Sequence, residues 1–87
     1  MAELFLSYGA QKISEARQAS NAADLAAVAK AAHAIKSSAG NIGASQVQDL
    51  ATRMERLALE AQAEQVAALM SELEEAFARV EVELKAK

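Results

Sequence analysis

His33 is the only histidine in the chain, and a lysine lies three residues to either side of it, at Lys30 and Lys36. Residues three positions apart lie on adjacent turns of one helix face, so a helix here would group one imidazole with two ammonium groups. An imidazole can act as a base or a nucleophile, and a lysine can balance the charge of a phosphate or meet an acidic partner. The spacing alone leaves two interpretations open: a phosphohistidine site, or a solvated helix surface with lysines for solubility.

The side chains around His33 are short. With Ala32 at the centre of a buried stripe, a step of about 100° per residue places His33 at the edge of the core and facing outward. An exposed helix face usually bears long polar side chains, so small neighbours leave the ring open to another protein. We therefore expect the flank around His33 to contact a partner through Ala26, Ala29, Lys30, Ser37 and Gly40.

The other reactive groups are few. The chain has no cysteine, which excludes disulfides, a thiol nucleophile and thiolate-bound zinc or iron. Ser37 and Ser38 lack the pattern of a nucleophile elbow, and the single histidine lacks nearby acidic residues on its helix for a metal site. We expect no metal and no cofactor, and an enzyme that acts alone on a small molecule is the least favoured function.

Charge and hydropathy restrict the partners. The net charge is −3, and residues 60–87 hold seven acidic residues against three basic ones. Without a concentrated basic face or aromatic platforms, nucleic acid is an unfavourable partner. No stretch approaches the ~18 consecutive apolar residues of a membrane span, and the first residues do not form a signal peptide. We expect a cytoplasmic monomer with no membrane insertion.

Helices must position these residues. Of the sequence 53% is apolar, about half of that is alanine, and proline is absent, which is typical of helical bundles. Apolar residues recur at steps of three and four, which predicts helices over about residues 3–19 and 22–40, a third from Ser45, and a fourth along residues 66–84. The predicted core stripes, in order, are Phe5, Gly9, Ile13 and Ala16; Leu25, Val28, Ala32, Ile35 and Ala39; Val47, Leu50, Ala51, Met54, Leu57 and Ala58; and Val66, Leu69, Met70, Leu73, Phe77, Val80 and Leu84.

Polar residues and glycines mark the expected helix ends. Asn21 is the expected N-cap of the second helix, with Asp24 in the favourable first turn. The cluster at residues 40–43 contains two glycines and predicts a helix-ending turn, with the second helix stopping at Gly40. Ser45 and Gln48 form a capping-box pattern for the third helix.

A further break is expected at residues 60–64, although they include no glycine or proline. One helix over residues 45–84 would be roughly 60 Å long at ~1.5 Å per residue and could not bury both stripes against the two shorter helices. The fold class is therefore all-α: residues 1–87 form a single antiparallel four-helix bundle, up-down-up-down. The acidic run Glu72, Glu74 and Glu75 is interpreted as a solvated face of the last helix.

The stretch from Ala32 to Ala44, AHAIKSSAGNIGA, resembles the signature of histidine-containing phosphotransfer (HPt) domains of multistep two-component signalling. That signature has an alanine before the phosphorylated histidine, then Leu or Ile, Lys, small residues, and a Gly-Ala pair that opens the next helix. The positions in register are His33, Ile35, Lys36, Ser38, Gly43 and Ala44, with Leu50 and Glu55 fitting the next helix.

The resemblance implies a phosphoryl carrier rather than an enzyme. His33 would accept a phosphoryl group from the phosphoaspartate of a receiver domain and pass it to an aspartate of another. Lys36 would balance the phosphoryl charge, and Glu55 would orient the imidazole. Mg²⁺ and most catalytic groups would belong to the receiver. The implied partners are receiver domains of response regulators or hybrid sensor kinases, docked on a face of the first two helices around His33 with the third helix at its border.

Two departures from the family pattern bear on docking. Ser37 stands where the family usually has glycine, and its hydroxyl can narrow the approach or bond to the phosphate. The family often has a short extra helix at the amino end, so the part played by Phe5 and Tyr8 stays open. The alternative function is a non-catalytic helical adaptor, or an HPt-like domain without phosphotransfer, that binds a partner through the same flank. The retained His33 and Lys36 favour the carrier.

Overall fold

The computed structural model describes residues 2–86, and these form four α-helices without a strand. The helices are α1 (Ala2–Asn21), α2 (Leu25–Ile42), α3 (Ser45–Leu59) and α4 (Ala63–Ala86). The predicted all-α class with four helices is confirmed. The side chains of residues 2–5 and of Ile42 are outside the described set, so the prediction that Phe5 packs in the core lies there too.

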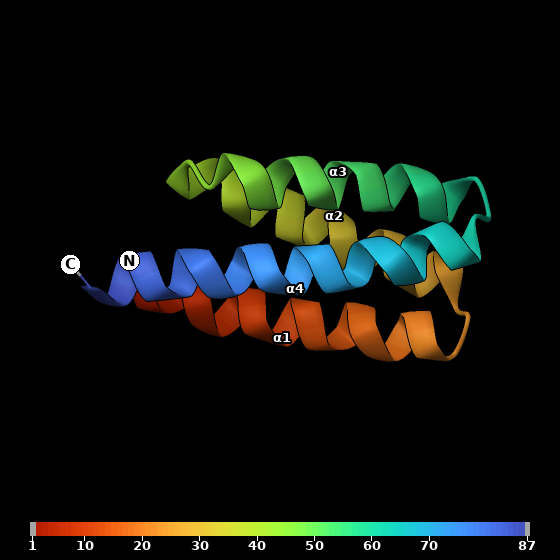
Figure 1. Ribbon diagram of the computed structural model, residues 1–87, viewed down its shortest axis with the longest axis horizontal. Coiled ribbons are helices and arrows are strands. Elements are labelled where there is room, and N and C mark those ends of the chain that lie inside the picture. Colours follow the sequence, from red (N-terminus) through yellow and green to blue (C-terminus); the bar gives the residue numbers. More distant parts are fainter. Residues whose placement is uncertain (1, 87) are drawn as a thin grey trace.

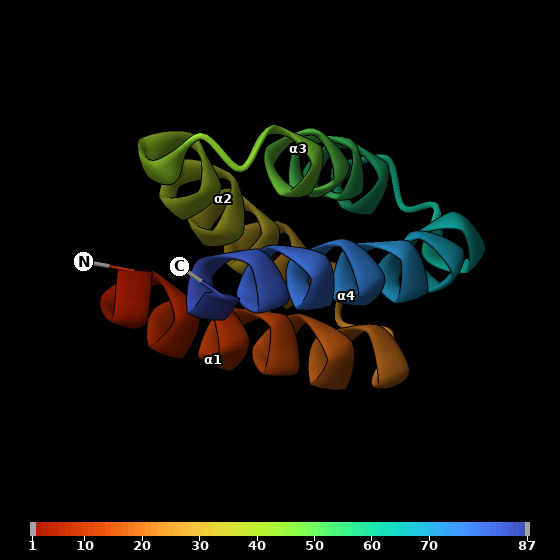
Figure 2. The same ribbon diagram turned by 60° about the vertical axis from the view of Figure 1, so that its left-hand side comes forward.

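The helices form an elongated bundle with principal extents of 38 × 19 × 18 Å. The connections α1–α2 and α3–α4 lie at one end, while the α2–α3 connection, the start of α1 and the end of α4 lie at the other (Figure 1). Each helix packs against two others: α1 and α3 both contact α2 and α4. Figure 2 shows the pair α2 and α3 stacked on the pair α1 and α4. Within residues 2–86, no helix combines the length and the apolar character that crossing a membrane requires.

The predicted stripes form the core. Most of their members are buried, and α2 packs closely because its buried positions are largely alanines. Ile35 and Met54 are among the largest side chains that are almost completely buried, and each contributes roughly 1.5–3 kcal/mol of transfer free energy. Four predicted members are only half-buried, at stripe ends or edges: Leu25, Leu57, Val80 and Leu84.

The three connections share one geometry. In each, a residue with positive φ follows the helix: Ala23 (57°), Gly43 (76°) and Ala61 (60°). The next residue donates its N–H to the carbonyl five positions back, as in a Schellman motif. These bonds run from Asp24 to Ala19 (2.8 Å), from Ala44 to Ala39 (2.9 Å) and from Gln62 to Leu57 (2.9 Å). The break predicted without glycine or proline near residues 60–64 is confirmed, and the left-handed Ala61 makes it.

The predicted cap of α2 was misplaced. Asp24 is the N-cap: its Oδ1 accepts a hydrogen bond from the Ala27 N–H at 3.2 Å. Asn21, the expected cap, is the last residue of α1. The left-handed Ala23 reverses the chain later than the sequence suggested, which leaves Asp24 as the residue that opens α2.

The predicted capping box of α3 was also wrong. Ala44 is the N-cap without a side-chain bond, and Ser45 is already helical. The second helix does not stop at Gly40 but continues to Ile42, and Gly43 is its C-cap in the left-handed conformation. Gly40 has another role, because a Cβ atom there would lie 2.7 Å from Nε2 of Gln48 on α3.

The acidic run on α4 is only partly solvated. Glu72 and Glu75 are exposed as predicted, but Glu74 pairs with Arg17 of α1. The Arg17 Nε donates to Glu74 Oε2 at 3.1 Å, and Nη2 donates to Oε1. This forked hydrogen bond holds the pKa of Glu74 below its usual value, against the opposing effect of burial. Arg17 and Glu74 thus form a polar link between the first and last helices.

Candidate functional site

His33 lies near the middle of α2 with 62% of its side chain exposed. The helix is fixed by Ala32, next to His33, and by Ile35, on the opposite face, both almost fully buried. Their burial sets the rotation of α2, and His33 therefore faces outward at the edge of the core, as the helical phase predicted.

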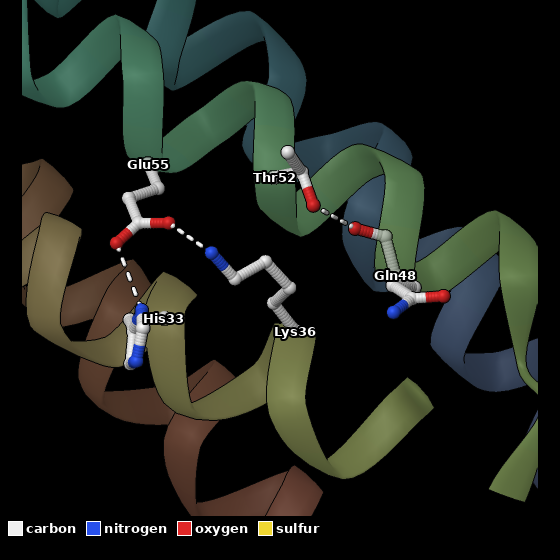
Figure 3. A network of polar contacts seen from close by, with 5 residues as sticks. All are labelled: His33, Lys36, Gln48, Thr52 and Glu55. Carbon is white, nitrogen blue, oxygen red and sulfur yellow. Dashed lines mark hydrogen bonds and ion pairs between the residues drawn. The ribbon is translucent and has the colours of Figure 1, made fainter. Parts of the chain in front are cut away.

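Glu55 on α3 joins the two functional residues of α2. Its Oε2 lies 3.0 Å from Nδ1 of His33, and its Oε1 accepts a hydrogen bond from Nζ of Lys36 at 2.8 Å (Figure 3). Both carboxylate oxygens are therefore engaged, one by each residue. The structure thus brings together His33, Lys36 and Glu55, which the sequence placed on two different helices.

The charge of Glu55 determines what the histidine can do. The hydrogen bond from Lys36 lowers the pKa of Glu55 most, the contact with His33 lowers it further, and burial opposes both. Glu55 is therefore an ionised acceptor at neutral pH, so Nδ1 of His33 must be the donor in their contact. A neutral imidazole then has its free lone pair on Nε2, which is a nucleophilic nitrogen.

An open surface hollow of about 320 Å³ lies beside the ring, lined by Ala29, Lys30, His33 and Glu55. Lys30 is exposed, whereas Ala29 is largely buried although it lines the hollow. The short Ala29 side chain leaves room next to the imidazole. The hollow can admit a group the size of a phosphoryl, but it is too open to enclose a small-molecule substrate.

The other residues predicted to meet a partner lie along α2 near His33. Ala26, Ser37 and Gly40 are exposed. Sequence reasoning missed Gln48, whose side chain lies over Gly40, and Thr52, whose Oγ1 donates to the Gln48 carbonyl at 2.8 Å. Gln48, Thr52 and Glu55 succeed one another along α3 beside Lys36 and His33 (Figure 3). Their spacing of four and three residues was the available signal for a shared helix face.

The third helix supplies one residue of the network around His33. The hydrogen bonds of His33 and Lys36 lead to α3, and none of those found in residues 2–86 leads to α1. The docking face expected on the first two helices, with the third at its border, stays a prediction. A role for α1 in docking stays a prediction; there Tyr8 is 42% exposed, and Lys12 Nζ lies 5.5 Å from its ring centroid.

In the described part of the chain, no three or more His, Cys, Asp or Glu side chains group as they would to hold a metal ion. The polar side chains of the site are instead arranged around one exposed imidazole.

Comparison with known proteins gives one result for nearly the whole chain. The family model described as Hpt domain matches residues 1–83. No curated protein matches, and no solved structure does. The matched range includes the His33, Lys36 and Glu55 network and all but the last residues of α4.

Proposed function

The chain belongs to the Hpt domain family, whose members serve phosphotransfer in two-component signalling, and we propose on this premise that His33 is its phosphoryl-carrying residue. His33 would take the group from the phosphoaspartate of one receiver domain and deliver it to the aspartate of another. Domains of this family are phosphocarriers rather than catalysts.

One observation carries the proposal: the largely exposed ring of His33 is held at Nδ1 by Glu55, and its other nitrogen, Nε2, turns away from that carboxylate (Figure 3). A carrier needs a nucleophile that a second protein can reach, in a fixed orientation and with its lone pair on the outward atom. The network with Glu55 supports each of these needs.

The transfer step follows from this arrangement. The Nε2 lone pair attacks the phosphorus of the receiver's acyl phosphate, the Nε2–P bond forms, and the P–O bond to aspartate breaks with its electron pair leaving on the carboxylate. The proton stays on Nδ1, so the phosphorylated ring carries a positive charge. The Glu55 carboxylate, 3.0 Å from Nδ1, stabilises that charge. In the reverse step the ring leaves phosphorus as a neutral imidazole.

Lys36 supports this step through Glu55. Its 2.8 Å hydrogen bond holds one carboxylate oxygen and lowers the pKa of the group. Glu55 is thereby kept both ionised and oriented toward His33. This support works equally in both directions of transfer, as a carrier between two aspartates requires.

The docking face we propose is centred on the outer side of α2 and includes the adjoining edge of α3, in an antiparallel up-down-up-down bundle. The small exposed residues Ala26 and Ser37 allow another protein's backbone to come close to the helix, and at Gly40, also exposed, a partner would meet the Gln48 side chain as well. Receiver domains, which carry the phosphoaspartate and bind Mg²⁺, are the partners that fit such a carrier.

The test is a phosphotransfer assay with receivers from the same organism that carry ³²P phosphoaspartate. We expect one or two receivers to label this chain rapidly with an acid-labile phosphoryl group. His33→Gln should take no label while its circular dichroism stays helical, and Lys85→Gln, a change at an exposed lysine of α4, should be labelled like the wild type.

Label on His33→Gln would refute the proposal, because the chain has no second histidine. If no receiver labels the wild type, and a receiver binds His33→Ala as tightly as the wild type, the adaptor function would replace the carrier.

A further inference from the structure

Lys30 and Lys36 occupy mirror positions about His33, yet their surroundings differ. They are three residues before and three after it, which rotates them by about 60° to opposite sides on a helix. Lys36 is 30% exposed and bonded to Glu55 at 2.8 Å. Lys30 is exposed, lines the hollow beside the ring, and has no ion pair among residues 2–86. Lys36 is therefore bonded to a carboxylate, whereas Lys30 is available to contact an anionic group.

The hollow beside the ring favours Lys30 as its neighbour. The imidazole of His33 leans back toward the N-terminus of α2, over the turn that contains Ala29 and Lys30, and these residues line the hollow with it. The same lean brings the Lys36 side chain back toward His33, but its ammonium group is bonded to Glu55 at 2.8 Å and does not line the hollow.

The orientation of the His33 ring also favours Lys30 over Lys36. Nδ1 of His33 faces Glu55, and Figure 3 shows the other ring nitrogen turned away from the Glu55 carboxylate and the Lys36 ammonium. A phosphoryl group bonded to Nε2 would extend to that side of the ring. The Lys36 ammonium is instead held at Oε1 of Glu55, by the hydrogen bond that lowers the Glu55 pKa most.

We propose that Lys30 is the residue that contacts the phosphoryl group on His33, and that Lys36 stays on Glu55 as a positioning residue. The inference rests on the proposed carrier function and names the cation that stabilises its phosphorylated form. It assigns to Lys30 the charge-balancing role that the family resemblance gave to Lys36.

The test uses phosphoramidate, a small phosphoryl donor that needs no docking, on the full chain with Lys30→Gln, Lys36→Gln and Lys85→Gln. Each substitution removes one positive charge, and Lys85 on α4, paired with Glu81, serves as the control. We expect Lys30→Gln to slow phosphorylation of His33 by about threefold to tenfold, as a partly solvated charge-assisted contact allows. Lys85→Gln should react like the wild type.

Nuclear magnetic resonance separates contact from positioning. On phosphorylation of the wild type, the ¹Hε–¹³Cε signal of Lys30 should shift and that of Lys36 should stay in place. In unphosphorylated Lys36→Gln the imidazole ¹⁵N shifts should show loss of the preference for a proton on Nδ1, and in Lys30→Gln they should not change. A shift at Lys36 with none at Lys30, or a Lys30→Gln rate equal to that of Lys85→Gln, would overturn the inference.

The two proposals fail in different ways. If receivers and phosphoramidate both label His33 but Lys30→Gln has no effect, the carrier function stands and the role of Lys30 falls. If phosphoramidate labels His33 with the expected Lys30 effect but no receiver does, the carrier function falls and the contact stands. If His33 accepts phosphate from neither donor, both are overturned.

Discussion

His33 of α2 and Glu55 of α3 are joined by a 3.0 Å contact between Nδ1 and Oε2, across 22 positions of sequence. This one contact orients the ring, places its proton on Nδ1 and links the two helices that border the site. It also means that the chemistry of an exposed histidine depends on a carboxylate from another helix. The first prediction follows from that dependence.

Replacing Glu55 by Gln should slow phosphotransfer by about tenfold, because a neutral amide stabilises the phosphorylated ring less than a carboxylate does. Glu55→Ala should be slower still, since it also frees the ring to rotate. The measurement is the single-turnover rate of label transfer from a phosphorylated receiver. Asp49→Asn, an equal loss of charge at an exposed position of α3, should leave the rate unchanged. A wild-type rate in Glu55→Ala would show that the contact has no part in transfer.

Ser37→Gly restores the residue that the family usually has one turn beyond the histidine. Ser37 is exposed on α2, and its removal widens the approach to the ring. We expect transfer as fast as in the wild type or faster, with a loss of roughly 0.5 kcal/mol in unfolding free energy because glycine is a poorer helix former. Transfer kinetics and urea unfolding measure the two effects. Loss of transfer would indicate that the hydroxyl takes part in the reaction.

The left-handed alanines predict where the fold can be stabilised. Ala61, with φ of 60°, lies in a backbone region that glycine adopts without steric cost. Ala61→Gly should raise the unfolding free energy by about 0.5–1 kcal/mol, and Ala23→Gly should do the same. Ala67→Gly, at an exposed position within α4, should lower it by about 1 kcal/mol. Urea denaturation of the three variants checks this, and a destabilised Ala61→Gly would contradict the positive φ.

Acid should weaken the fold through two carboxylates. The pKa values of Glu55 and Glu74 lie below their usual 4.5 in the folded chain, because Lys36 and Arg17 donate hydrogen bonds to them. The folded state therefore binds fewer protons, and this part of the stability is present above about pH 4.5 and lost as the pH falls through the lowered values. The difference in urea midpoint between pH 7 and pH 3 should be smaller in Glu74→Gln than in the wild type. An equal difference would mean that the pair with Arg17 does not perturb Glu74.

Much of the fold could be predicted from the apolar pattern. Apolar residues at steps of three and four indicate which face of each helix is buried. The break after α3 was predicted because a single helix over residues 45–84 would be too long to bury both of its stripes against the two shorter helices. The helix ends could not be predicted in the same way. Ala23 and Ala61 have positive φ although alanine gains nothing from it, because packing of the flanking helices outweighs a local preference. The positive φ of Ala23 cannot be recognised in the sequence, so Asn21 was predicted as the N-cap of the second helix in place of Asp24.

The site was predicted in part from the helical periodicity of α2 and in part from the resemblance to HPt domains. The rotation of α2 gave the exposure of His33 and the lysines on either side. The approach of Glu55 could not follow from the residues alone, since it depends on how α3 lies against α2, and only the family pattern indicated it. Neither source showed that one lysine would be bonded to Glu55 and the other left open, because that difference arises from one carboxylate on one side of α2.

The three Schellman turns also bear on how fast the chain folds. The connections over residues 22–24, 43–44 and 60–62 join helices that pack directly on each other, so much of the packing of consecutive helices is made close to the turn that joins them. Folding rates rise as the mean sequence separation of contacts falls, and helical bundles of this kind fold in microseconds to milliseconds. The α1–α4 contact, which includes the Arg17–Glu74 pair, has the longest loop to close. Consecutive helices should therefore pack against each other first, and the contact between α1 and α4 should form last.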